Sequence, residues 1–165
     1  MRKKIFLILA ILWMAIIFSF SAKDADESTK ESNAVGMFLG SIVYSDFEDW
    51  QVEEQQAFAE KWDHPVRKCA HMTEYAILGF FLVGARYDGR ENCRRAMGRA
   101  FRIAALYAAT DEIHQYFVPG RACMFTDVCI DSVGALLGIL FATVIMIVFE
   151  HSQCMRKKGS KWYSV

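Results

Sequence analysis

Ionisable side chains recur at helical spacing within three otherwise apolar segments of this sequence. Residues three and four apart lie on one face of a helix, so each segment is expected to present a polar stripe. The candidate catalytic residues are His71, Glu74, Asp111, His114, Asp127 and Asp131. The candidate substrate-binding residues are Lys68, Tyr75, Gln115 and Arg121. Charged groups are costly in an apolar setting, which favours a functional pocket over simple packing.

Two kinds of chemistry fit these residue types. Mixed imidazole and carboxylate ligands suit a divalent cation such as zinc, manganese or non-haem iron, although the sequence has no HExxH motif. Without a metal, a histidine held by a carboxylate can act as a general acid or base, and Arg121 with Lys68 or Arg67 can hold a phosphate or carboxylate. No GxSxG motif marks a nucleophilic serine. A self-satisfied network that only fixes helix packing is the alternative, so the sequence leaves open whether the protein is an enzyme and whether it binds a metal.

Four apolar segments must position these residues. They cover about residues 5–21, 68–86, 99–118 and 127–149 of the 165-residue chain, in which hydrophobic residues make up 54%. A helix needs about 20 residues to cross a hydrocarbon core of about 30 Å. We therefore expect an all-α fold in which residues 1–165 form a single domain, a four-helix transmembrane bundle. The first segment also has features of a signal peptide, but the three later segments favour a retained anchor.

Local signals mark where these helices turn and approach one another. Pro119-Gly120 and Asp88-Gly89 should break the chain after the third and second segments. Gly134 and Gly138, one helical turn apart, should let another helix approach the fourth segment closely. The five cysteines are odd in number and form no CxxC pair, which argues against a disulfide framework or a structural zinc site.

The segment of about residues 30–63, between the first two apolar helices, has helical patterns of its own. One amphipathic stretch is expected after the possible caps Ser32 and Asn33. A second stretch contains Phe47, Trp50, Phe58 and Trp62. An interfacial helix facing the lipid headgroups, a lid over the polar site, and packing on the end of the bundle are the three interpretations.

The distribution of basic residues predicts how the bundle sits in a membrane. They flank the apolar segments on one side of a four-span arrangement, at Arg2, Lys3, Lys4, Arg86, Arg90, Arg94, Arg95, Arg99, Arg156, Lys157, Lys158 and Lys161. The stretch from Lys23 to Asp63 instead holds eleven acidic residues and three lysines. The positive-inside rule then places both termini in the cytoplasm and the candidate site near the outer surface, with Arg67 and Lys68 as exceptions. The formal net charge is zero, and the DExH sequence at residues 111–114 has no accompanying P-loop, so no nucleic-acid partner is expected.

Four ordered blocks of this sequence resemble the VanZ-like family of small bacterial membrane proteins. The blocks are residues 67–75, 107–115, 117–121 and 127–134. The family usually shows Ser-Ser-Gln after the first span, whereas this chain has Ser19-Phe20-Ser21 without the glutamine. The resemblance implies a bacterial plasma membrane, a role in the cell envelope and a link to teicoplanin resistance, but it does not supply a reaction.

Two functional hypotheses follow from the sequence. The first is an outward-facing site that binds or modifies an anionic envelope lipid or a cell-wall (peptidoglycan) precursor. The second is a non-enzymatic membrane factor that assembles with a partner or passes an ion, with the polar network serving structure. The sequence does not determine the oligomeric state.

Overall fold

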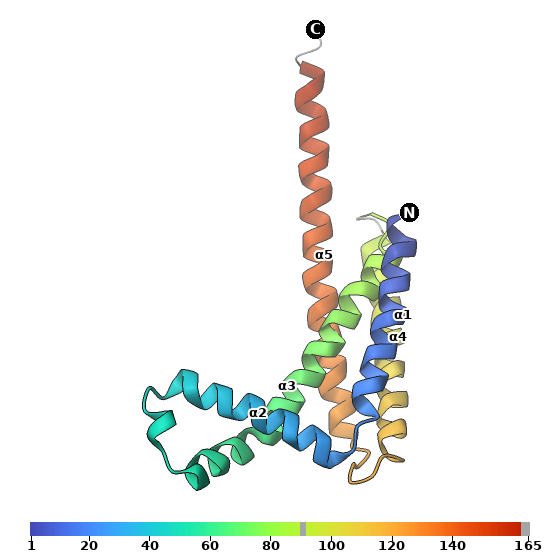
Figure 1. Ribbon diagram of the computed structural model, residues 1–165. Helices are drawn as coiled ribbons and strands as arrows, with labels where there is room; N and C mark the ends of the chain where they lie inside the picture. The colour runs from blue at the N-terminus through green and yellow to red at the C-terminus, as the bar shows by residue number, and fades with distance from the viewer. Residues whose placement is uncertain (90–91, 163–165) are drawn as a thin grey trace.

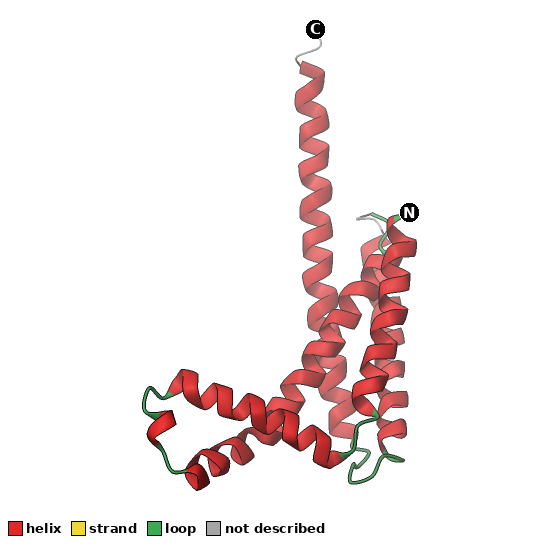
Figure 2. Ribbon diagram, viewed as in Figure 1, coloured by secondary structure: helices red, strands yellow, loops and turns green. Residues whose placement is uncertain are grey.

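Helices account for all the regular structure in the part of the chain that the computed structural model describes, residues 1–89 and 92–162 with side chains through Met155. The α-helices are α1 (Arg2–Ser21), α2 (Ala25–Val43), α3 (Val52–Arg86), α4 (Cys93–Gln115) and α5 (Phe125–Trp162), with a short 3-10 helix η1 (Phe47–Asp49) between α2 and α3. Figure 2 shows helices joined by loops, which confirms the all-α prediction. Arg90 lies outside the described residues, as do the side chains of Arg156, Lys157, Lys158 and Lys161.

Helices α1, α3, α4 and α5 form a bundle, and α3 packs against each of the other three (Figure 1). The N-terminus and the connection between α3 and α4 lie at one end of the bundle. The α1–α2 and α4–α5 connections lie at the other end. The core contains the alanines that α4 buries every fourth residue, Ala96, Ala100, Ala104 and Ala108. Such a stripe of small side chains lets neighbouring helices pack closely.

Glycines bring α3 and α5 into direct backbone contact, as the spacing of Gly134 and Gly138 predicts. A Cβ atom added to Gly138 would lie 1.8 Å from the Ala76 carbonyl oxygen. The same addition at Gly134 would lie 2.2 Å from the Met72 oxygen. Because α3 covers Gly134 and Gly138, this surface of α5 is not available for contact with another protein.

The helix boundaries differ from the apolar boundaries at most ends. The expected second span and the second half of the aromatic stretch, with Phe58 and Trp62, form one continuous helix, α3. This helix begins with a capping box between Gln51 and Glu54 and contains Pro65. Helix α4 begins before residue 99 and ends before residue 118, and α5 extends well past residue 149. Charged side chains such as lysine, arginine and glutamate are good helix formers, so a helix continues after its apolar pattern ends.

Helix α2 also begins earlier than expected, so the proposed caps Ser32 and Asn33 are wrong. The N-cap is Asp24, whose carboxylate accepts a hydrogen bond of 2.8 Å from the Glu27 backbone. Ser32 lies inside the helix, where its hydroxyl donates to Asp63 of α3. This contact joins α2 to the first part of α3.

Helices α2 and the first part of α3 form a hairpin that extends sideways from the bundle (Figure 1). The aromatic residues of the hairpin, for which a position facing the headgroups was one of three interpretations, pack on one another. Phe58, for example, lies with its ring centroid 5.4 Å from that of Phe47 and 6.2 Å from those of Trp50 and Trp62. The exposed apolar face of the hairpin comprises Val35, Phe38, Ile42, Val43 and Val52.

Two of the described helices are long and apolar enough to cross a membrane, namely α1 and the Phe125–Met155 part of α5. Their mean hydropathies are 2.3 and 2.6. Helices α3 and α4 carry charged residues at their ends, and neither contains a segment that is both long enough and apolar enough to meet this requirement. The composition of the helices thus supports two of the four expected spans directly.

Candidate functional site

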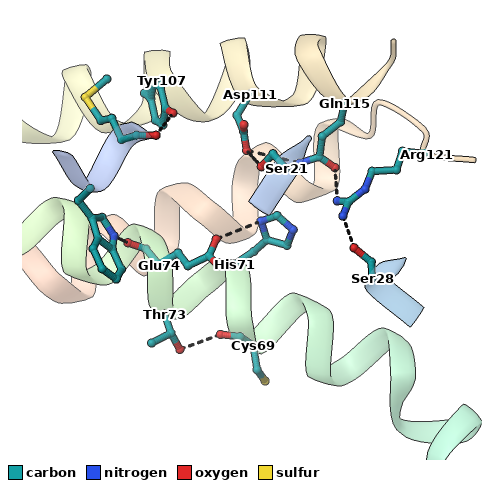
Figure 3. Close-up of polar contacts among 12 residues, drawn as sticks. Ser21, Ser28, Cys69, His71, Thr73, Glu74, Tyr107, Asp111, Gln115 and Arg121 are labelled. Carbon is teal, nitrogen blue, oxygen red and sulfur yellow. Dashed lines mark hydrogen bonds and ion pairs between the residues drawn. The ribbon is translucent and has the colours of Figure 1, made fainter. Parts of the chain in front are cut away.

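The predicted polar residues lie at the end of the bundle where α1 turns into α2 and α4 turns into α5. Figure 3 shows side chains from α1, α2, α3, α4 and the α4–α5 loop meeting there. Three separate polar stripes therefore converge at one depth, as helical spacing and the predicted topology require.

A buried group of three ionisable residues forms the centre of the site. One ligand atom from each of His71, Asp111 and Asp131 lies within 4.8 Å of the others. Asp111 and Asp131 are only 2% and 1% exposed. One imidazole and two carboxylates in this arrangement could hold a divalent metal ion.

Asp111 is held in place by two neighbouring side chains. Its Oδ2 accepts a hydrogen bond of 2.8 Å from the Ser21 hydroxyl at the end of α1 and a longer one of 3.4 Å from Gln115. Its Oδ1 has no hydrogen-bond partner, and neither oxygen of Asp131 has one. Glu74 Oε2 and the Tyr75 hydroxyl, next to this group on α3, are also unpartnered.

Glu74 and Tyr75 extend the site along α3. Glu74 Oε2 lies 3.8 Å from His71 Nδ1, and the Glu74 backbone oxygen accepts a hydrogen bond from the Trp13 indole at 2.8 Å. Tyr75 is fully buried, with its ring centroid 6.1 Å from that of Tyr107. These contacts fix α3 against α1 and α4 beside the central group.

Arg121 connects the α4–α5 loop to α2. Its guanidinium donates to the Lys23 backbone oxygen at 2.9 Å, to Gln115 Oε1 at 3.1 Å and to the Ser28 hydroxyl (Figure 3). Burial lowers the pKa of Arg121 from its usual value, but a guanidinium remains charged at any physiological pH. Arg121 thus brings a fixed positive charge to the wall of the site while holding the hairpin in place.

Two further basic residues on α3 lie in ion pairs. Lys68 pairs with Asp127 at the start of α5. Arg67 pairs with Asp63 at 2.8 Å, one helical turn earlier on the same helix. Asp127 is therefore next to Lys68 and outside the central group, although it was predicted to act with Asp131.

His114 and Glu112 do not lie as the stripes suggest. His114 was expected to share the site with Asp111, but its ring lies 4.3 Å from that of Phe18 on α1, outside the central group. Glu112 was not among the candidate site residues, but it is 2% exposed and accepts a hydrogen bond of 2.9 Å from the Met124 backbone. Glu112 thus holds the beginning of α5 near the site.

Ser21 is the site residue that the spacing of ionisable groups did not reveal. It is fully buried against Asp111. In the sequence, Ser21 was marked only by its place in Ser19-Phe20-Ser21, which corresponds to the Ser-Ser-Gln of the VanZ-like family. The glutamine of that motif is absent from this chain, so the motif did not assign a role to Ser21. The packing of α1 against α4 gives Ser21 its contact.

Three hollows that share lining residues lie beside the central group. An apolar groove of about 550 Å³ lies between α1, the hairpin and α3, and its lining includes Trp13, Phe20, Leu39, Trp62, Val66 and Ile77. A polar pocket of about 230 Å³ adjoins it and is lined by Ser28, Glu31, Arg67, His71, Glu74 and Arg121 among others. A basic pocket of about 170 Å³ shares Arg67, His71 and Arg121 with the polar pocket and adds His64, Lys68 and Asp127. An apolar hollow therefore lies directly beside a charged one.

The five cysteines are free, as their number and spacing predicted. None belongs to the central group. The site thus consists of imidazole, carboxylate, guanidinium, ammonium, amide and hydroxyl groups.

The fold and the site define a helical-bundle protein with apolar outer helices and an ionisable site buried at one end. The chain belongs to the VanZ/LLP1 family, whose model matches residues 6–148. Membership of this family indicates a membrane protein linked to glycopeptide resistance. No curated protein and no solved structure gives a significant match to the chain.

Proposed function

We propose that the protein spans the bacterial plasma membrane four times and binds an anionic envelope lipid or lipid-linked cell-wall precursor at its outer face. The observation that carries this proposal is the junction between the apolar groove and the polar pocket. The two hollows share Phe20, Val35, Val66, Ala70 and Glu74 in their walls. An amphiphile needs an apolar channel for its chain that opens directly onto polar partners for its headgroup.

The charges favour an anionic headgroup. The basic pocket is lined by Arg67, Lys68 and Arg121, against one carboxylate, Asp127. Arginine side chains bind phosphate oxygens through charge-assisted hydrogen bonds. Arg67 and Arg121 line both charged pockets. A phosphate of a lipid in the apolar groove would reach the guanidinium of Arg121 and would compete with Asp63 for that of Arg67.

The arrangement of the helices supports an outward orientation of this site. The acidic hairpin and the site lie at one end of the bundle, and the N-terminal lysines lie at the other with Arg86 and Arg94 (Figure 1). The positive-inside rule assigns the basic end to the cytoplasm. The hairpin runs sideways with an exposed apolar face, which suits a position along the outer membrane surface.

A binding measurement on the full chain in detergent tests this proposal. Native mass spectrometry with added phosphatidylglycerol or phosphatidylcholine should show a preference for the anionic lipid. Arg67→Gln should weaken that preference by roughly 10–100-fold, the equivalent of a lost charge-assisted hydrogen bond. Arg102→Gln removes an exposed arginine of α4 away from the pockets and serves as the matched control.

A second pair of variants tests the apolar groove. Ala70→Leu adds bulk where groove and pocket meet, at an exposed position, and should reduce binding of both lipids. Ala15→Leu on the exposed face of α1 should not. Equal lipid binding by wild type, Arg67→Gln and Ala70→Leu would refute the proposed lipid-binding site.

Mass spectrometry of the lipid that co-purifies with the protein distinguishes a glycerophospholipid from an isoprenoid pyrophosphate precursor.

A further inference from the structure

Two carboxylates of different helices are buried together at the centre of the site. Asp111 of α4 and Asp131 of α5 are nearly inaccessible, and their oxygens lie within 4.8 Å of each other and of a His71 nitrogen. Two buried carboxylates at this separation cannot both keep their charge unless a cation compensates them. The arrangement therefore calls for a positive group between them.

The basic side chains near the pair are engaged elsewhere. Lys68 pairs with Asp127, Arg67 pairs with Asp63, and Arg121 donates to three other oxygens. Among the described residues, no lysine or arginine thus forms an ion pair with Asp111 or Asp131.

Unpartnered polar atoms mark the position where a cation would bind. Both Asp131 oxygens and Asp111 Oδ1 are buried without a hydrogen-bond partner. Buried polar atoms are rarely left unpaired in native proteins. A single shared proton would satisfy one contact between the carboxylates, whereas a metal ion would engage both carboxylates and the imidazole together.

We propose that His71, Asp111 and Asp131 bind one divalent transition-metal ion of the zinc or manganese type. One imidazole and two carboxylates suit these ions. Ser21 and Gln115 hold the other oxygen of Asp111, and Glu74 lies beside His71, where a carboxylate orients a metal-bound imidazole. Three protein ligands leave coordination positions open, as in catalytic metal sites.

The metal site opens towards the proposed binding pockets through a single residue. His71 lines both the polar and the basic pocket, so an ion on its ring would lie next to the space assigned to a headgroup. The metal proposal nevertheless does not rest on lipid binding, because its ligands belong to the central group itself. The two proposals can fail separately.

Metal titration of the full chain without lipid tests the inference. Tag-free protein in detergent is stripped with a chelator and titrated with Zn²⁺, and in parallel with Mn²⁺, by calorimetry and elemental analysis. One ion per chain is expected. Asp131→Asn, which keeps the size of the side chain, should weaken binding by more than the roughly 10–100-fold typical of outer-shell changes. Asp88→Asn, at an exposed aspartate in the α3–α4 connection, is the matched control and should retain the ion.

X-ray absorption of the zinc-loaded wild type keeps the test independent of how the variants fold. Nitrogen and oxygen ligands with one imidazole are expected. A thiolate ligand would place the ion at a cysteine and overturn the proposal, as would equal affinity in wild type and Asp131→Asn. Wild type that binds neither ion but shows an infrared band of a protonated carboxyl, lost in Asp131→Asn, would show that a proton holds the pair instead.

Discussion

The contact between α3 and α5 allows a quantitative test of the packing that assembles the site. Gly138→Ala adds one methyl group that would lie 1.8 Å from the Ala76 carbonyl oxygen and 2.6 Å from its carbonyl carbon. Carbon–oxygen contacts between close helices are about 3.3–3.6 Å. The obstacle is backbone, so it cannot rotate away, and the helices must separate locally by roughly 1.5 Å.

The expected cost follows from two opposing terms. Overpacking a well-packed interior typically costs about 1–3 kcal/mol, and a clash with backbone belongs at the upper end of that range. Replacing a helical glycine with alanine returns about 1 kcal/mol through helix propensity. We therefore expect Gly138→Ala to lower the free energy of unfolding by about 2 kcal/mol.

A control of identical chemistry is available in α4. Gly98 lies within that helix, and a Cβ atom there would meet nothing within 4 Å. Gly98→Ala should raise stability by up to about 1 kcal/mol. SDS titration of both variants in mixed micelles, followed by tryptophan fluorescence, measures the difference. Gly138→Ala that is as stable as Gly98→Ala would refute the close helix approach.

Three further predictions concern the site and its orientation. Ser21→Ala removes the hydroxyl that donates to Asp111 and should cost about 1.5–3 kcal/mol in the same titration, as for other hydrogen bonds to charged groups; no change would show that the contact contributes nothing. Arg121→Gln should release the hairpin and speed its cleavage by protease, since the loop loses contacts with α2; unchanged resistance would argue against this anchor. A membrane-impermeant thiol reagent on intact cells should label Cys123, exposed in the α4–α5 loop, but not Cys154 near the end of α5. The reverse labelling would overturn the proposed orientation.

Local patterns in the sequence determined the class of fold and the position of its turns. Runs of apolar residues with helical periodicity require an all-α protein. Gly120 and Gly89 adopt positive φ angles of 75° and 89° at the two expected breaks, because that backbone conformation is open mainly to glycine. The glycine pair of α5 also predicted a close helix contact, although not that α3 would fill it.

Helix ends were harder to predict than helix positions. The apolar pattern reports which residues avoid water, whereas hydrogen bonding and helix propensity determine where a helix ends. Helix α3 therefore runs through Pro65 and joins two segments that the pattern separated. The hairpin aromatic residues likewise found partners within the hairpin, which the periodicity of a single helix cannot reveal.

The sequence by itself determined that three helices carry polar stripes, because residue spacing decides which side chains share a helix face. It also determined that the stripes reach one depth, because the direction of the chain decides at which end of each helix its stripe lies. Only the tertiary structure decided which members of the stripes meet. A stripe covers a broad arc of its helix, so the rotation of that helix directs Asp111 and Asp131 towards His71 but leaves His114 against Phe18. Ser21 joins the site from a helix with no stripe at all, because the packing of α1 brings its hydroxyl to Asp111.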